Sequence, residues 1–473
     1  MSDEACREKS RREFLKILGG CAAAVTFPGL YGTVAQGQAT ASRPNVLMIV
    51  ADDLNDWVGC LGGHLQARTP NIDRLAQRGV LFDNAHAAAP ICNASRASFL
   101  TGLRPSTSGI YDNDQPLRSY LPNVVTMPQH FMANGYRTMG AGKFFHHVDP
   151  GSWQEYFPSK ALFKHRPTEP FPPHVPLCKL SGIDEESDFG PLQVADEEMG
   201  DGKIARWAAE VLGRKYERPF FLGIGMVRPH KPMYAPGKYF DEYPAKSVSL
   251  PVINLHDLDD LPPGGVNFAR AFGPDGFRIL QDGLPEAVAA YLAATTFVDA
   301  QIGIILDALD ESPYGGNTIV IFWTDNGFHF GEKLHWAKKT LWDRSTHCPL
   351  IMVVPGLTTP GGRCTRTVSM MDVYPSLADI CGLSPRSDLE GVNLKPLLQD
   401  PNATWDRPAV TTFMTNNHTV RSERWRYIRY SDGGEELYDH ENDPHEHNNL
   451  AQVPGYEQIK TDLALWLPQV NMP

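Results

Sequence analysis

Three apolar runs, residues 44–51, 219–226 and 317–324, constrain the fold of this chain more than any other feature. Each is short, carries no charge and is rich in Val, Ile, Leu or Phe, which is typical of strands buried on both faces of a parallel sheet. Helical patterns, such as residues 69–76, lie between them. The sequence therefore predicts an α/β fold in which helices sandwich a large, mostly parallel central sheet.

The pattern changes after Pro401. Residues 409–414, 418–421 and 425–430 alternate apolar and polar side chains, as antiparallel strands do, and a last helix is expected from about Gly455 to Trp466. We therefore expect three parts: a flexible leader over residues 1–43, the main α/β domain over residues 44–398, and a smaller C-terminal subdomain over residues 399–473. This subdomain should hold an antiparallel sheet and one helix.

Oxygen donors follow two of the apolar runs. The first run ends in Asp52 and Asp53, and the last ends in Asp325, Asn326 and a glycine. Ligands of open α/β sheets bind at the carboxyl ends of strands, and adjacent carboxylates repel one another unless a cation joins them. Four oxygen donors without thiolate or imidazole suit Ca²⁺, or Mg²⁺ less well, rather than zinc. The alternative for each pair is a plain turn that faces water.

A cysteine lies between these two strands in sequence. Cys92 is followed by Arg96 and then by Thr101 and Gly102. Because residues 96–100 are typical of the first turns of a helix, we expect Cys92 just before a helix N-terminus, where free N–H groups favour an anion. The planar guanidinium of Arg96 suits a tetrahedral oxyanion. On its own, a cysteine with this spacing is more often a buried structural residue.

The stretch from Cys92 to Gly102 resembles the signature of the type I sulfatases of the alkaline-phosphatase-like superfamily, in which Cys-x-Pro-x-Arg precedes Thr-Gly. Ala94 stands where that signature usually has proline. The resemblance implies that a formylglycine-generating enzyme converts Cys92 to formylglycine, whose hydrate attacks the sulfur of a sulfate ester. It also implies one Ca²⁺, held by Asp52, Asp53, the modified Cys92, Asp325 and Asn326.

Further basic residues resemble the sulfate-binding residues of that family. Lys143 and His146 form a Gly-Lys-x-x-His segment, which implies contacts to the sulfate and the nucleophile. His230 follows the second apolar run and resembles the histidine that protonates the departing alcohol or holds the sulfate. Lys338 matches the last sulfate-binding lysine, with Lys339 as the alternative register. The predicted catalytic residues are thus Cys92, Arg96, Lys143, His146, His230 and Lys338, with His230 or His146 as the general acid.

Several segments, among them residues 69–73, 98–105 and 229–232, resemble the iduronate-2-sulfatase branch. Asn326 and Leu103 depart from that branch, which usually carries His and Arg there. The resemblance favours an exo-acting enzyme on sulfated saccharides such as glycosaminoglycans, and leaves the sugar, the sulfate position and endo versus exo action open. The alternatives are a formylglycine-dependent phosphodiester or phosphonate hydrolase, and a non-catalytic glycan-binding relative, which should have lost some of these residues.

The N-terminus resembles a twin-arginine export signal. Arg11 and Arg12 precede Phe-Leu-Lys and a weakly apolar run to about Phe27. This resemblance implies the twin-arginine export machinery and a periplasmic or extracellular location. Residues 18–21 also resemble a lipoprotein box, so a lipid anchor at Cys21 is an alternative. We expect no other apolar run long enough to span a membrane, and the net charge of −12 argues against general binding of nucleic acid.

Overall fold

The computed structural model describes residues 43–158 and 169–473. Residues 43–473 form one compact unit. The predicted export signal, with Arg11 and Arg12, and the alternative lipid anchor at Cys21 lie outside the described residues, so both stay predictions.

An eight-stranded sheet forms the centre of this unit, and its strand order places β1 among its inner strands. All neighbouring strands are parallel except β11, which is antiparallel to both of its neighbours. The three apolar runs lie side by side in it as β6, β1 and β8, which confirms the predicted α/β fold. From one edge to the other the strands are β12 (Gly362–Ser369), β2 (Val80–His86), β11 (Leu350–Val353), β8 (Thr318–Thr324), β1 (Asn45–Asp52), β6 (Phe220–Pro229), β3 (Arg137–Gly142) and β4 (Glu155–Phe157).

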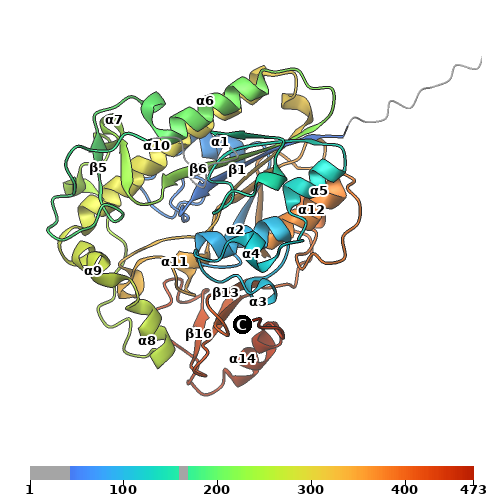
Figure 1. Cartoon of the computed structure of the whole chain (residues 1–473). Helices are drawn as coiled ribbons and strands as arrows, with labels where there is room; N and C mark the ends of the chain where they lie inside the picture. Colours follow the sequence, from blue (N-terminus) through green and yellow to red (C-terminus); the bar gives the residue numbers. More distant parts are fainter. Residues whose placement is uncertain (1–42, 159–168) are drawn as a thin grey trace, which may run out of the picture. The chain divides into compact units, whose positions relative to one another are not determined.

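Helices cover both faces of this sheet (Figure 1). Alternate residues of β1 enter different cores: Leu47 and Ile49 pack into one, and Met48 and Val50 into the other. The first core includes α1 (Pro70–Ala76), α6 (Gly200–Leu212) and α10 (Leu284–Glu311). The second includes α2 (Cys92–Thr101), α5 (Met127–Ala133) and α12 (Val373–Ile380). All positions of β1 are buried because helices cover both faces of the sheet, which explains why its sequence is a continuous apolar run.

Helix α10 spans 28 residues and is apolar almost all round. Among the described residues it is the one helix long and apolar enough to cross a membrane, and 83% of its most apolar window is buried inside the fold. The expectation that no such run exists beyond the N-terminus was therefore wrong. A helix that is apolar on every side packs in the core of a large protein, and α10 has that place here.

The C-terminal sheet is antiparallel throughout and consists of β13 (Ala409–Thr412), β14 (His418–Arg421), β15 (Trp425–Arg429) and β16 (Glu435–Asp439). Its helix is α14 (Glu457–Ala464), shorter than the predicted one at both ends. The amide of Thr412 on β13 donates a 2.9 Å hydrogen bond to the carbonyl of Ala88. This sheet therefore holds the segment that leads to Cys92.

Shorter elements complete the described part of the chain. Strands β5 and β7 form a parallel pair, and β9 and β10 an antiparallel pair. Their bounds are β5 (Phe189–Leu192), β7 (Met233–Pro236), β9 (His329–Phe330) and β10 (Trp336–Ala337), and the remaining α-helices are α3 (Pro105–Ser108), α4 (Leu117–Tyr120), α7 (Gly237–Phe240), α8 (Pro263–Ala269), α9 (Gly273–Asp282), α11 (Asp343–Thr346) and α13 (Lys395–Gln399).

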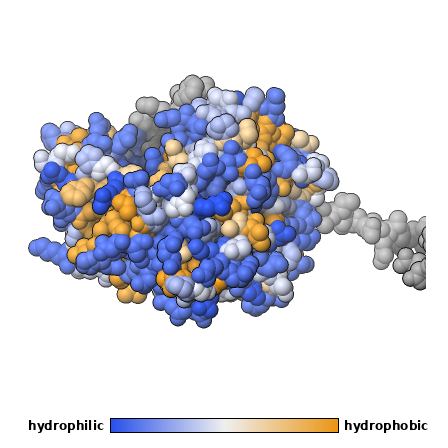
Figure 2. All heavy atoms as spheres, turned by 90° about the horizontal axis from the view of Figure 1, so that it is seen from below, coloured by the Kyte–Doolittle hydropathy of each residue, from blue (hydrophilic) through white to orange (hydrophobic). Residues whose placement is uncertain are grey.

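One face of the molecule is mainly polar (Figure 2). Figure 2 shows a face on which hydrophilic side chains predominate and apolar ones gather in small patches.

The six cysteines among the described residues are free thiols: Cys60, Cys92, Cys178, Cys348, Cys364 and Cys381.

Candidate active site

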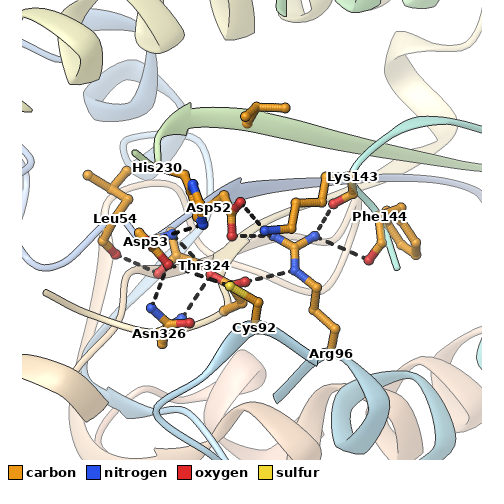
Figure 3. Close-up of polar contacts among 12 residues, drawn as sticks. Asp52, Asp53, Leu54, Cys92, Arg96, Lys143, Phe144, His230, Thr324 and Asn326 are labelled. Carbon is orange, nitrogen blue, oxygen red and sulfur yellow. Dashed lines mark hydrogen bonds and ion pairs between the residues drawn. The ribbon is translucent and has the colours of Figure 1, made fainter. Parts of the chain in front are cut away.

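The two acidic strand ends meet at one edge of the central sheet (Figure 3). Strands β1 and β8 are parallel and in register, with Ala51 opposite Thr324. The next residues along the two strands, Asp52 and Asp325, therefore leave the sheet side by side. Both carboxylates are completely buried. The predicted convergence of the acidic pairs at the carboxyl ends of two strands is thus present.

Asp53 has a strained backbone, with φ at +62°, which costs a residue other than glycine on the order of 1–3 kcal/mol. Two hydrogen bonds hold it there. Its amide donates to Oδ1 of Asp325 at 3.1 Å, and its carbonyl accepts from the hydroxyl of Tyr291 at 2.7 Å. Tyr291 comes from the buried helix α10 and also accepts from the amide of Asn55 at 2.9 Å. This tyrosine therefore fixes the turn that aims Asp53 at the cluster.

Cys92 is the first residue of α2, so the helix begins earlier than the sequence predicted. Ile91 is extended, and its carbonyl already accepts from the amide of Ser95. The sulfur of Cys92 accepts from Nζ of Lys338 at 2.8 Å and lies 3.7 Å from Oδ1 of Asp53. Burial, with the charge of Asp52, raises the pKa of this thiol to about 12. At neutral pH the unmodified side chain is therefore a neutral thiol and a weak nucleophile.

Arg96 lies one turn further along α2 and is buried, with 1% of its surface exposed. Its Nε donates to Asp325 at 2.7 Å, and its Nη2 donates to Asp52 at 3.2 Å. Its Nη1 donates to the carbonyls of Lys143 and Phe144. A single guanidinium thereby joins the ends of β1, β8 and β3.

Lys143 enters the cluster because β3 and β6 approach closely at two glycines. A Cβ on Gly225 would lie 2.0 Å from the carbonyl carbon of Lys143, and Gly142 has a φ of +68°. The amide of Lys143 donates to the carbonyl of Gly225 at 2.8 Å. Its ammonium then donates to Oδ2 of Asp52. Gly142 of the Gly-Lys-x-x-His segment and Gly225 of β6 thus allow a backbone contact that larger residues would block.

Lys338 reaches the cluster from the loop after β10, and its ammonium donates to Oδ1 of Asp53. Lys339 is fixed through its backbone instead, since its amide donates to the carbonyl of Pro90 at 3.1 Å. The structure therefore places Lys338, rather than the alternative Lys339, beside Cys92.

The chain matches known proteins over most of its length. Residues 44–383 match the sulfatase family, and residues 331–472 match the C-terminal region of N-sulphoglucosamine sulphohydrolase. The chain belongs to the sulfatase family. The resemblance to the type I sulfatases is thus confirmed, and the enzyme is a sulfuric ester hydrolase.

Two relatives and two solved structures give the range of similarity. A sulfatase of Formosa agariphila is 36% identical over 454 residues, which cover 92% of this chain and 88% of that one. The iduronate 2-sulfatase of Mus musculus is 33% identical over 433 residues, covering 78% and 76%. A 2-O GAG sulfatase structure has a TM-score of 0.70 at 24% identity, covering 90% and 91%. The structure of the phosphonate monoester hydrolase of Silicibacter pomeroyi has a TM-score of 0.74 at 22% identity, and the match covers 89% of this chain and 93% of that one. The last two show the fold alone.

Charges in this sulfatase site are balanced. Burial alone would raise the pKa of Asp52, but Lys143, His230 and Arg96 together hold it well below its usual value. Burial raises the pKa of Asp325 to about 6, and Asp52 and Asp53 add to that rise while Arg96 opposes it. The buried ion pairs join three carboxylates, those of Asp52, Asp53 and Asp325, to three cations, those of Arg96, Lys143 and Lys338.

The two histidines of the site differ in environment. His230 has its Nε2 3.7 Å from Oδ2 of Asp53, and its Nδ1 donates to the carbonyl of Lys231. Burial, reinforced by the positive charge of Lys143, lowers the pKa of His146 to about 2. His146 is therefore neutral throughout the physiological range, whereas His230 has a carboxylate beside its Nε2. The neighbouring His147 bonds to the carbonyl of Asn113 at 2.7 Å.

The residues at the strand ends fit a hard divalent cation. Oδ2 of Asp53 and Oδ1 of Asn326 are buried and have no hydrogen-bond partner in the described part of the chain. Ligand atoms of Asp52, Asp53, Cys92 and His230 all lie within 4.8 Å of one another. Buried oxygens that lack a partner are costly unless something binds them. Carboxylate and amide oxygens are the donors that Ca²⁺ prefers.

The structure brings the ten predicted site residues into one region, while their individual roles stay predictions. Sequence reasoning missed the residues that support them. Tyr291 is one, and Thr324 is another, since its hydroxyl donates to the carbonyl of Leu54 at 2.7 Å. A tyrosine within an apolar helix and a threonine at a strand end give no local signal, because their importance depends on which residues the fold places opposite them.

Proposed function

We propose that this sulfatase removes the 2-O-sulfate from a uronic acid at the end of a sulfated glycan, as an exo-acting enzyme of the iduronate-2-sulfatase type. One observation carries the proposal: the 33% identity to iduronate 2-sulfatase extends over 433 residues and most of both chains.

The electrostatics of the site suit a sulfate ester. Formylglycine made from Cys92 would supply the attacking hydroxyl, and Ca²⁺ on Asp52, Asp53, Asp325 and Asn326 would neutralise charge on the sulfate oxygens. The chain itself provides Arg96, Lys143 and Lys338, whose positions are fixed before substrate arrives by the carboxylates that they pair with. Such preorganised cations stabilise the charge that develops on the equatorial oxygens as the ester bond breaks.

His230 is the better candidate for the general acid. Because its Nδ1 donates to a carbonyl, its Nε2 carries a proton only in the imidazolium form, and that nitrogen lies 3.7 Å from the carboxylate of Asp53. Protonated Nε2 can give its proton to the leaving oxygen of the sugar. His146 has no proton to spare in this way, since its pKa lies at about 2. It is suited to orienting the sulfate through a neutral hydrogen bond.

A panel of defined substrates tests the proposal. We expect kcat/KM for a disaccharide with a terminal 2-O-sulfated uronate to exceed that for 6-O-sulfated glucosamine by at least about tenfold, since a sugar-binding site discriminates by the polar groups it pairs. The reverse preference would refute the uronate assignment. A higher rate on 4-nitrophenyl phenylphosphonate than on 4-nitrophenyl sulfate would favour the phosphonate hydrolase alternative.

We propose further that the protein is exported by the twin-arginine route to the periplasm or beyond. The support is the sequence of residues 10–27 alone. Replacing Arg11 and Arg12 together by lysine should keep the sulfatase in the cytoplasmic fraction. Unchanged export of the double variant would contradict the proposal, and labelling with radioactive palmitate would reveal the alternative anchor at Cys21.

A further inference from the structure

Lys231 differs from the other cations around the active site. Arg96, Lys143 and Lys338 each form an ion pair with a buried carboxylate of the cluster. Lys231 directly follows His230 and is half-buried, yet among the described residues it forms no ion pair. Its ammonium donates one long hydrogen bond, of 3.4 Å, to the hydroxyl of Ser187. It is thus a cation that the folded chain has not neutralised by direct contact.

The surroundings of Lys231 place it at the rim of the cluster. Burial lowers its pKa, the charge of Lys338 lowers it further, and Asp53 raises it, so this ammonium lies within electrostatic reach of the catalytic groups. Asp184 and Glu186 also act on it, and both are exposed residues of the loop before β5. Lys231 therefore lies near both the catalytic cluster and a solvent-exposed loop, and its ammonium contacts Ser187 of that loop.

A purely structural role explains these observations less well. A lysine that served to tie down the exposed loop should pair directly with Asp184 or Glu186, because removing an ammonium from water is costly unless a partner compensates for it. Instead, both acids act on Lys231 from beyond ion-pair distance. A half-buried cation with a single weak partner is what a binding site for an anion requires.

We propose that Lys231 binds the carboxylate of the uronic acid while the catalytic cluster binds its sulfate. This proposal rests on the proposed function and names the residue that gives it specificity. A 2-O-sulfated uronate carries two anionic groups on opposite sides of one sugar ring, so it needs two cationic sites that are neighbouring but separate. Within the cluster, the charges of the carboxylates and of their cationic partners cancel, and Lys231 adds one positive charge beside them. A sulfated sugar without a carboxylate would have no group to pair with this ammonium.

The test compares the wild-type enzyme with Lys231→Met on three substrates. For the 2-O-sulfated uronate disaccharide we expect kcat/KM to fall about 10- to 100-fold, the size expected for one charged hydrogen bond, mainly through a higher KM. For the same disaccharide with its carboxyl reduced to an alcohol, and for 4-nitrophenyl sulfate, both enzymes should agree within about twofold. Lys231→Arg should recover part of the loss on the uronate.

Lys238→Met is the matched control, because Lys238 is an exposed lysine in the following helix, paired with Asp196. It should change none of the three rates. Equal losses on all three substrates for Lys231→Met would overturn the proposal in favour of a structural or sulfate-binding role, and no loss on the uronate would overturn it outright while leaving the proposed function intact. If the wild-type enzyme neither cleaves the uronate nor is inhibited by it, the proposed function fails, and this proposal with it.

Discussion

Replacing Arg96 by methionine should destabilise the protein far more than the loss of a surface charge does. Arg96 is 1% exposed and donates to Asp52, to Asp325 and to two carbonyl groups. Its removal leaves two buried carboxylates beside each other with one cation fewer. Breaking a buried ion pair by removing one partner costs about 3–5 kcal/mol of the free energy of unfolding. We expect Arg96→Met to fall in that range and to lose activity.

The loss should depend on pH in a defined direction. Burial already raises the pKa of Asp325 to about 6, and removing Arg96 raises it further. The unfolded chain releases this proton near about 3.9, whereas the native state retains it above that pH. The native state then binds more protons than the unfolded state, so stability falls as pH rises. The deficit of Arg96→Met should therefore be larger at pH 8 than at pH 5.5.

Urea denaturation, monitored by circular dichroism at pH 5.5 and pH 8, measures the loss in free energy of unfolding and its dependence on pH. Arg363→Met is the control. Arg363 pairs with Asp83 at 2.7 Å, but 56% of its side chain is exposed, so its replacement should cost about 0–1 kcal/mol. The reasoning would be refuted if the two variants lost equal stability. A deficit for Arg96→Met that shrank with rising pH would contradict the role given to Asp325.

Three further predictions concern the chemistry. Cys92→Ala should keep the fold but lower kcat by several orders of magnitude, and wild-type activity should scale with the fraction of position 92 converted to formylglycine by mass spectrometry; full turnover with an intact thiol would contradict this. Chelation should abolish activity, and Ca²⁺ should restore it and raise the melting temperature; recovery with Zn²⁺ alone would exclude the oxygen-ligand site. His230→Asn should slow sugar sulfates by about 10²- to 10⁴-fold but hardly affect 4-nitrophenyl sulfate, whose leaving group needs no proton; equal losses would remove His230 as the acid.

The strand ends were predictable because burial on both faces leaves a continuous apolar signature. Asp52 and Asp325 directly follow the apolar runs that became β1 and β8, and the parallel register of these strands brings the two carboxylates together. The start of α2 was not predictable in the same way, because Ile91 at its N-cap position offers no side chain to mark it. Helix α10 was missed since an apolar surface on every side has no helical period.

Contacts between distant segments lay beyond sequence reasoning. Arg96 was expected to bind substrate, and nothing in residues 92–102 indicates that it also joins Asp52 to Asp325. The same holds for the hydroxyl of Tyr291, 238 positions from the carbonyl of Asp53 that it holds. Such contacts depend on the tertiary fold, because no local sequence pattern specifies which distant side chains a loop will contact.

The balance of charge in the cluster supports the proposal that this sulfatase uses both a metal ion and a modified cysteine. Burial and Asp52 raise the pKa of Cys92 to about 12 even though Lys338 donates to its sulfur, so the cations do not make a thiolate. The carboxylates likewise cancel the ammonium and guanidinium groups that we propose as sulfate ligands. A divalent cation bound at the strand ends would give the site a net positive charge. A nucleophile with its own hydroxyl removes the dependence on thiol ionisation, and the two requirements therefore have one electrostatic origin.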